Sequence, residues 1–180
     1  LAMQRIDHIR LMARYNSWMN ERLYTAASTL PDEALSAERG AFFGSILGTL
    51  NHLVVADRIW LERYTEHPAN FQALQVLAGL EKPTRLDQPM AADIRALTLL
   101  RRRLDECIEA LATEMSEHQL DEPLNYRNMK GVPAQKHFFA LLMHLFNHQT
   151  HHRGQATTLL SQAGVDVGVT DLLALIPDEL

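Results

Sequence analysis

Residues 144–155 read HLFNHQTHHRGQ and place four histidines within nine residues of the chain. Apolar residues on both sides recur every three or four positions, which predicts a long amphipathic helix. A helix turns by about 100° per residue, so His148 and His152 fall on its buried stripe. His144 and His151 flank that stripe. The stretch therefore predicts two inward-facing imidazoles on one helix.

Imidazole nitrogens are common ligands of zinc and other divalent transition metals. His144 and His152 are separated by about 12 Å along the helix axis, too far for both to reach one ion at about 2 Å. Only a neighbouring pair can chelate, and the pair on the stripe, His148 and His152, is the candidate. Such a pair can also be incidental, since it lacks the glutamate of the zinc-protease motif. From spacing alone the two interpretations carry equal weight.

A third ligand must come from another part of the chain, and His52 is the best-placed interior histidine. Gly48, Thr49 and Ala56 lie within one turn of it and leave room for a metal, water or ligand. Taken alone, His52 fits a hydrogen-bonded, partly buried histidine. Three histidines would leave a coordination position open, as in catalytic zinc sites. The histidines outside these two segments are predicted to be terminal, in loops or exposed: His8, His67, His118 and His137.

Composition predicts an ordinary globular protein, and 180 residues fit a single domain over residues 1–180. The net charge of −5 disfavours nucleic-acid binding, and the run Arg101 to Arg103 is predicted to be a solvated helix face. No segment has the shape of a signal peptide or of a membrane span, which predicts a cytoplasmic protein without membrane contact. The single cysteine, Cys107, is predicted to be a small core residue.

The remaining pattern predicts an all-α four-helix bundle with long crossover connections, an architecture that commonly places metal sites between facing helices. Residues 68–89 suit a crossover, residues 115–133 an irregular loop or small hairpin, and residues 165–180 a tail that packs back. The four predicted helices span residues 7–30, 43–64 or 45–64, 91–114 and 134–162.

Asn147 to Gln155, NHQTHHRGQ, closely resembles the NHxxHHRGQ signature of the DinB family. The resemblance implies a four-helix bundle, often a homodimer, with a divalent metal held by three histidines. Carried over residue by residue, the ligands are His52, His148 and His152, the trio that helix geometry also selects. Weaker matches extend the resemblance over nearly the whole chain: Ala13-Arg14-Tyr15-Asn16 with Trp18 and Asn20, Asn51-His52, and Tyr126, Asn128 and Gly131.

The resemblance also implies thiol chemistry, because some relatives use bacillithiol, mycothiol or glutathione in transferase or isomerase reactions. We therefore expect a metal-dependent enzyme in which zinc or nickel activates a low-molecular-weight thiol or water toward a small electrophilic substrate. One alternative is a non-enzymatic, stress-associated metal-binding or interaction protein. Another is a purely structural bundle with polar histidines in its seam.

Several neighbours of the histidines carry their own expectations. Arg153 points about 100° away from His152, so it is expected in a structural ion pair or a dimer contact rather than on an anionic substrate. Asp57, at about 140° from His52, is expected to cap or pair elsewhere. Gln155 and Asn147 are candidates to hydrogen-bond the ligand imidazoles.

Overall fold

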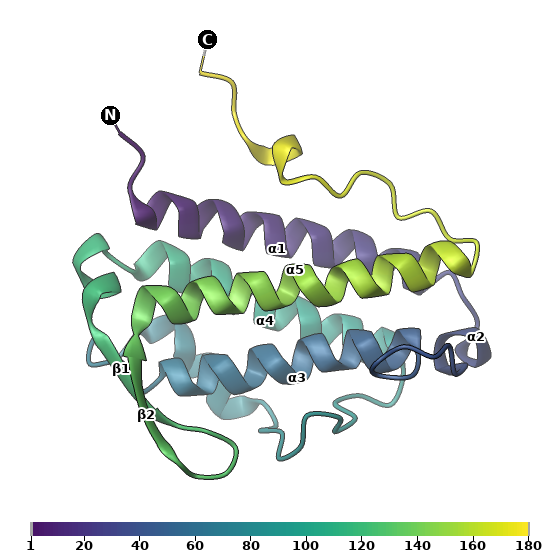
Figure 1. The fold of residues 1–180 in the computed structure, drawn as a ribbon, viewed down its shortest axis with the longest axis horizontal. Helices are drawn as coiled ribbons and strands as arrows, with labels where there is room; N and C mark the ends of the chain where they lie inside the picture. The colour runs from purple at the N-terminus through teal and green to yellow at the C-terminus, as the bar shows by residue number, and fades with distance from the viewer. Residues whose placement is uncertain (1, 180) are drawn as a thin grey trace.

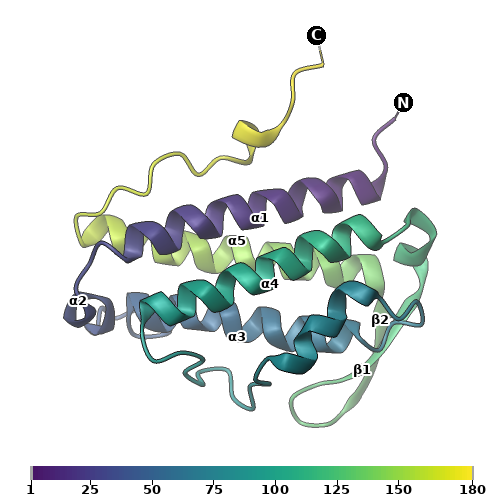
Figure 2. The ribbon, with the colours of Figure 1, turned by 180° about the vertical axis from the view of Figure 1, so that it is seen from behind.

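Four long helices lie side by side and make up about half of the protein, whose computed structural model describes residues 2–179 (Figure 1). Seen from behind, α4 crosses in front of α5, with α1 above the two and α3 below them in this view (Figure 2). Helix α1 packs on α4 and α5, and α3 packs on α5 and α4. The helices are α1 (Arg5–Ala27), α3 (Ile46–Tyr64), α4 (Ile94–Glu114) and α5 (Phe138–Gln162).

Side-chain caps set where these helices begin. Ser45 accepts a hydrogen bond from the backbone N–H of Gly48 at the start of α3, and Asp93 does the same for Ala96 at the start of α4. Helix α4 therefore starts at Ile94, three residues later than predicted. Helix α5 ends before Gly164, whose positive φ of 81° suits glycine at a helix C-terminus.

A β-hairpin replaces the first turn that was predicted for the last helix. Strands β1 (Pro123–Arg127) and β2 (Pro133–His137) pair antiparallel, with Tyr126 opposite Ala134. The Asn128 side chain accepts from the backbone N–H groups of Lys130 and Val132 and so closes the turn. The chain is thus mostly helical with one small sheet, and α5 starts at Phe138 rather than at residue 134.

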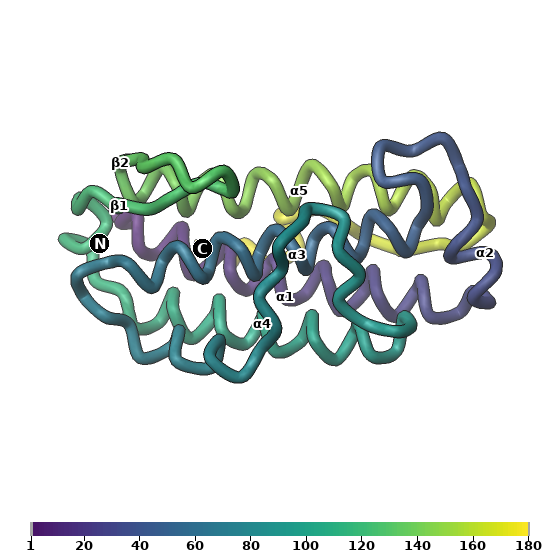
Figure 3. Tube along the Cα trace, turned by 90° about the horizontal axis from the view of Figure 1, so that it is seen from below, coloured from purple at the N-terminus to yellow at the C-terminus, as the bar shows by residue number. Residues whose placement is uncertain are grey.

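The connection from α3 to α4 crosses the outside of the helices (Figure 3). Its 3-10 helix η1 (Gln72–Gly79) packs on α4 and α3, and its last part brings Leu86 to α3. Three further short elements lie in the other connections: α2 (Asp32–Ser36), η2 (Glu117–Asp121) and η3 (Leu172–Leu175). None of the helices within residues 2–179 is both long and apolar enough to span a membrane.

The C-terminal tail packs back only in part. The Tyr15 hydroxyl donates to the Thr170 carbonyl at 2.5 Å, and Arg22 donates to the Val167 carbonyl. Helix η3 still lies against α1, although its Leu173 is 74% exposed, and beyond η3 the tail rises away from α1 (Figure 1). Cys107 is buried in the core, as predicted.

A buried polar cluster crosses the middle of the core and joins all four long helices. Arg101 pairs with Asp57 at 2.5 Å and with Asp105 at 2.8 Å, and is only 1% exposed. The prediction that Arg101 lies on a solvated face is therefore wrong, although Arg102 and Arg103 are exposed. The cluster consists of Asn16, Asn20, Asp57, Arg101, Asp105, Gln149 and Arg153.

Two other side chains are more buried than predicted. Arg153 is 3% exposed and donates to Asn16 Oδ1 at 2.5 Å, so it contacts amides inside the protomer rather than a carboxylate or a second copy. His67 is 2% exposed, since its ring packs between Phe71 and Phe138. Arg153 and His67 thus form hydrogen bonds inside the core. The candidate metal ligands are other histidines.

Candidate metal centre

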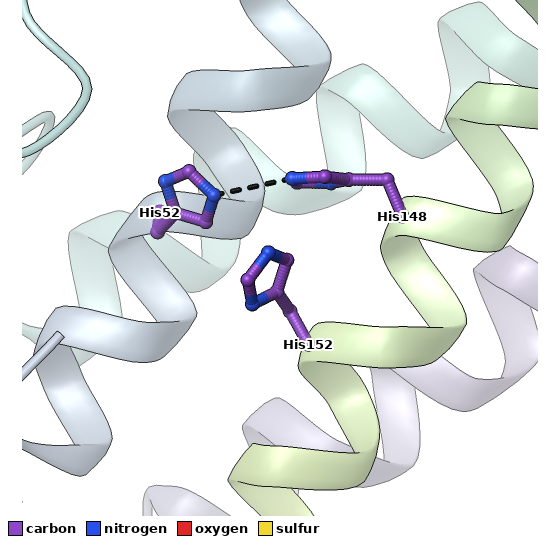
Figure 4. A group of neighbouring side chains, drawn as sticks. All are labelled: His52, His148 and His152. Carbon is purple, nitrogen blue, oxygen red and sulfur yellow. Dashed lines mark hydrogen bonds between the residues drawn. The ribbon is translucent and has the colours of Figure 1, made fainter. Parts of the chain in front are cut away.

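Three histidines from two facing helices point toward one another (Figure 4). His52 comes from α3, and His148 and His152 come from successive turns of α5. One ring nitrogen from each lies within 4.8 Å of the other two. The Nε2 atoms of His52 and His148 are 3.2 Å apart. The structure therefore brings together the three residues that the sequence singled out.

The loop before α3 fixes the His52 ring. Phe43 stacks on this ring with a centroid distance of 3.8 Å and an interplanar angle of 17°. This approach requires glycine at position 48, because a Cβ there would lie 2.2 Å from the Phe43 carbonyl oxygen. The space beside Gly48 is thus filled by backbone and is not available to a ligand, contrary to prediction. Ala56 does line the open cavity.

Hydrogen bonds select the tautomers of two of the imidazoles. His52 Nδ1 lies 3.3 Å from the Leu86 carbonyl oxygen, and His152 Nδ1 lies 2.8 Å from Gln155 Oε1. Because both oxygens only accept, each Nδ1 carries the proton and each Nε2 keeps its lone pair. Gln155 thus has the role predicted for it, whereas Asn147 is exposed. The contact of His52 with Leu86 was not predicted, because it is made by a backbone carbonyl, which every residue type has.

Burial keeps the three rings neutral. Desolvation, followed by proximity to the other histidines, lowers the pKa of His148 to about 3. Desolvation likewise lowers the pKa of His52 to about 4, and it lowers the pKa of His152. Neutral imidazole is the form that binds a metal.

The donor set fits one divalent ion. Ligand nitrogens at about 2.1 Å from a tetrahedral ion are roughly 3.4 Å apart, close to the observed spacing between His52 and His148. A small inward shift of His152 completes the set, since all ligand atoms already lie within 4.8 Å. The His148 Nδ1 atom is buried and has no hydrogen-bond partner among residues 2–179. Moving the His148 proton from Nε2 to Nδ1 therefore breaks only the contact between His148 Nε2 and His52 Nε2.

A cavity of about 420 Å³ opens on the three histidines. His144 and His151 line it as well, so the two flanking histidines border the space rather than complete the cluster. Much of the remaining wall is aromatic or apolar: Phe42, Phe43, Ile59, Trp60, Leu86 and Met129. Such a cavity suits a small molecule with an apolar part, held next to a group that could take an open coordination position.

The chain is similar to known proteins in sequence and in fold. The family model of the DinB family matches residues 3–179. The chain is 30% identical to "Protein DinB" of Bacillus subtilis over 157 residues, 87% of each chain, and 42% identical over 60 residues to "Uncharacterized protein YrdA" of the same organism, a third of each chain. A crystal structure of a DinB-like protein from Bacillus cereus superposes with a TM-score of 0.58 at 27% identity, covering 84% of this chain and 89% of the other.

Proposed function

The chain belongs to the DinB family, and on this basis we propose that it is a metal-dependent enzyme whose divalent ion is held by His52, His148 and His152. The observation that carries the proposal is the convergence of one ring nitrogen from each residue within 4.8 Å. These three neutral rings sit at the wall of a cavity large enough for a small substrate. A purely structural role for the histidines would not require that cavity.

The reaction we propose is attack of a low-molecular-weight thiol, or of water, on a small electrophilic substrate. A bound divalent ion would lower the pKa of the coordinated thiol or water, so that the nucleophilic anion exists near neutral pH. The Leu86 carbonyl and Gln155 hold the ring tautomers that present lone pairs. Phe43 covers one face of His52 and excludes water from it. Trp60 provides an apolar surface for the substrate.

The donor set of three imidazoles suits zinc or nickel among divalent metals, and we propose one of these as the resident ion. We further propose that residues 1–180 form one four-helix-bundle domain with crossover connections, and that the protein is cytoplasmic and a homodimer. The alternative function is a non-enzymatic, stress-associated metal-binding or interaction protein with the same ligands.

Metal analysis of purified variants tests the ligand assignment. His148→Ala and His152→Ala proteins should each lose the stoichiometric zinc or nickel of the unmodified protein. His151→Ala is the matched control, since His151 lies on the same helix, is exposed, and is only a neighbour of the cluster. Full metal content in folded His148→Ala and His152→Ala proteins would refute the site.

A panel of thiols with electrophilic small molecules then separates an enzyme from a metal-binding protein. We expect metal-dependent turnover that is lost in the His148→Ala protein and kept in the His118→Ala protein, since His118 is exposed and lies outside the residues that line the cavity. If the protein holds stoichiometric metal but turns over no electrophile, either with a thiol or with water alone, the non-enzymatic alternative is favoured.

A further inference from the structure

One cation near the metal centre lacks an acidic partner. Arg63, in the last turn of α3, is half-buried, and within residues 2–179 its guanidinium forms no hydrogen bond and no ion pair. It lies over the ring of Trp60, 4.4 Å from the centroid, and over Tyr126 at 5.1 Å. The nearest acid along the helix, Glu62, is occupied by Arg58 at 2.6 Å. Arg63 therefore has free donors that point into a partly desolvated space.

Arg63 stands where two cavities meet. The cavity on the three histidines, of about 420 Å³, and a second one of about 810 Å³ share Ile59, Arg63 and Met129. The second cavity lies between the end of α3, residues 82–84 and the β-hairpin. A molecule that fills the first cavity and extends toward the second must pass the guanidinium.

Aromatic rings connect the metal centre to Arg63 without a break. His144 lies 5.8 Å from His148 and 4.9 Å from Trp60, measured between ring centroids. His52 and Arg63 are eleven residues apart on α3, which puts them within about 20° on one face and about 16 Å apart along the axis. From the His148 ring the path to the guanidinium runs through His144 and Trp60, over contacts of 5.8, 4.9 and 4.4 Å.

We propose that Arg63 binds the carboxylate of an elongated small-molecule substrate whose reactive end lies at the three-histidine site. This inference rests on the proposed function. An arginine fork matches a carboxylate in shape and charge, and a partly buried position strengthens the contact. The aromatic wall between the two ends suits an apolar or planar middle part. Lys82 and Arg127 line the second cavity together with Glu62 and Glu66 and balance their charges, so Arg63 leaves one net positive charge, which suits a singly charged carboxylate.

Calorimetric titration with ω-mercaptocarboxylic acids of increasing chain length tests the inference, with ω-mercaptoalcohols of equal length as matched probes. Once the probe is long enough to reach from the three-histidine site to Arg63, we expect the acid to bind at least about tenfold more tightly than the alcohol. A hydrogen bond to a charged group typically has an effect of this size. In Arg63→Met this preference should fall to about one. Arg63→Lys should keep part of it, because lysine retains the charge but not the fork.

Arg95→Met is the control for loss of one positive charge, since Arg95 is exposed on α4 and outside the residues that line the two cavities. It should leave the preference unchanged. Equal binding of acid and alcohol at every length, or an unchanged preference in Arg63→Met, would overturn the inference.

The same titration on chelator-treated protein separates this inference from the metal assignment. Without the ion both probes should bind more weakly, but the ratio of acid to alcohol should persist, because Arg63 does not depend on the metal. If the unmodified protein binds no metal but still prefers the acid over the alcohol, the metal centre alone is refuted. If it binds metal but shows no preference for the acid, the role of Arg63 alone is refuted.

Discussion

Replacing Arg101 by methionine removes the cation at the centre of the buried polar cluster. Its guanidinium contacts Asp57 Oδ2 at 2.5 Å and Asp105 Oδ1 at 2.8 Å, and the Leu53 carbonyl at 3.3 Å. Both carboxylates are almost inaccessible to solvent. In the intact cluster two arginines balance two aspartates, whereas the variant leaves two carboxylates with Arg153 alone. We expect a large loss of stability.

The magnitude follows from the charge that is left behind. Removing one partner of a buried ion pair costs about 3–5 kcal/mol, because the other charge stays buried without compensation. For a domain of this size such a loss lowers the melting temperature by roughly 6–20 °C. Burial already raises the pKa of Asp57 and raises that of Asp105 to about 6, and Arg101 opposes this.

Acidification should reduce the loss. Without Arg101 the folded-state pKa of the carboxylates rises further above the unfolded value, so the folded state binds more protons than the unfolded state. Stability of the variant then increases as the pH falls. The deficit relative to the unmodified protein should be larger at pH 8 than at pH 5.

Urea denaturation at these two pH values measures both effects. Arg102→Met is the matched control, since the neighbouring Arg102 pairs with Glu21 at the surface, about half exposed, and should cost less than about 1 kcal/mol. Arg101→Met combined with Asp105→Asn restores charge balance and should recover part of the loss. A deficit below about 1 kcal/mol for Arg101→Met, or one that does not change with pH, would refute the reasoning.

Three further outcomes are expected. The Cβ of Gly48→Ala would lie 2.2 Å from the Phe43 carbonyl oxygen, which must move, so this variant should lower the unfolding free energy in urea by about 1–3 kcal/mol. Gly154→Ala is the control and should not destabilise, because nothing lies within 4 Å of its new Cβ. Because the folded pKa of His148 is about 3, metal-free protein should lose stability as the pH falls from about 6.5, where the unfolded state takes up protons first. Allowing for solvent screening, the share of this loss that comes from His148 is roughly 1–2 kcal/mol. His148→Asn should remove that share in the same urea assay and leave the share of His52 and His152, whose pKa values burial also lowers. Cys107 is 3% exposed with its pKa raised by burial to about 11, so it should react with a disulfide reagent only after denaturation.

The long helices and the three histidines were predictable because they depend on local periodicity. The apolar stripe of α5 places His148 and His152 on one face in any helix of this sequence, and the interior position of His52 follows from its own helix. The small hairpin was harder to predict, because the residues 134–137 that form β2 also continue the helical pattern. Strand pairing with β1 decides their conformation, and pairing is not a local property.

Charged and polar residues in the core could not be assigned from the sequence. Arg101 belongs to a run of three arginines. Its burial is favourable because it pairs with Asp57 on the facing helix α3 and with Asp105 one turn later on α4. His67 lies in a loop, as predicted, but its burial depends on how the crossover packs Phe71 and Phe138 around its ring. In each case one partner, Asp57 or Phe138, lies far away in sequence.

The metal centre and the buried polar cluster share the same two helices. On α5, His148 and His152 face the cavity, while the next residue after each, Gln149 and Arg153, enters the cluster. On α3, His52 faces the cavity, and Gln149 donates to Asp57 and to the Leu53 carbonyl on the other side. A rotation of α5 that moved its histidines away from His52 would also bury unsatisfied amide and guanidinium groups, which is costly. The cluster therefore fixes the relative rotation of the two helices on which the spacing of the three nitrogens depends.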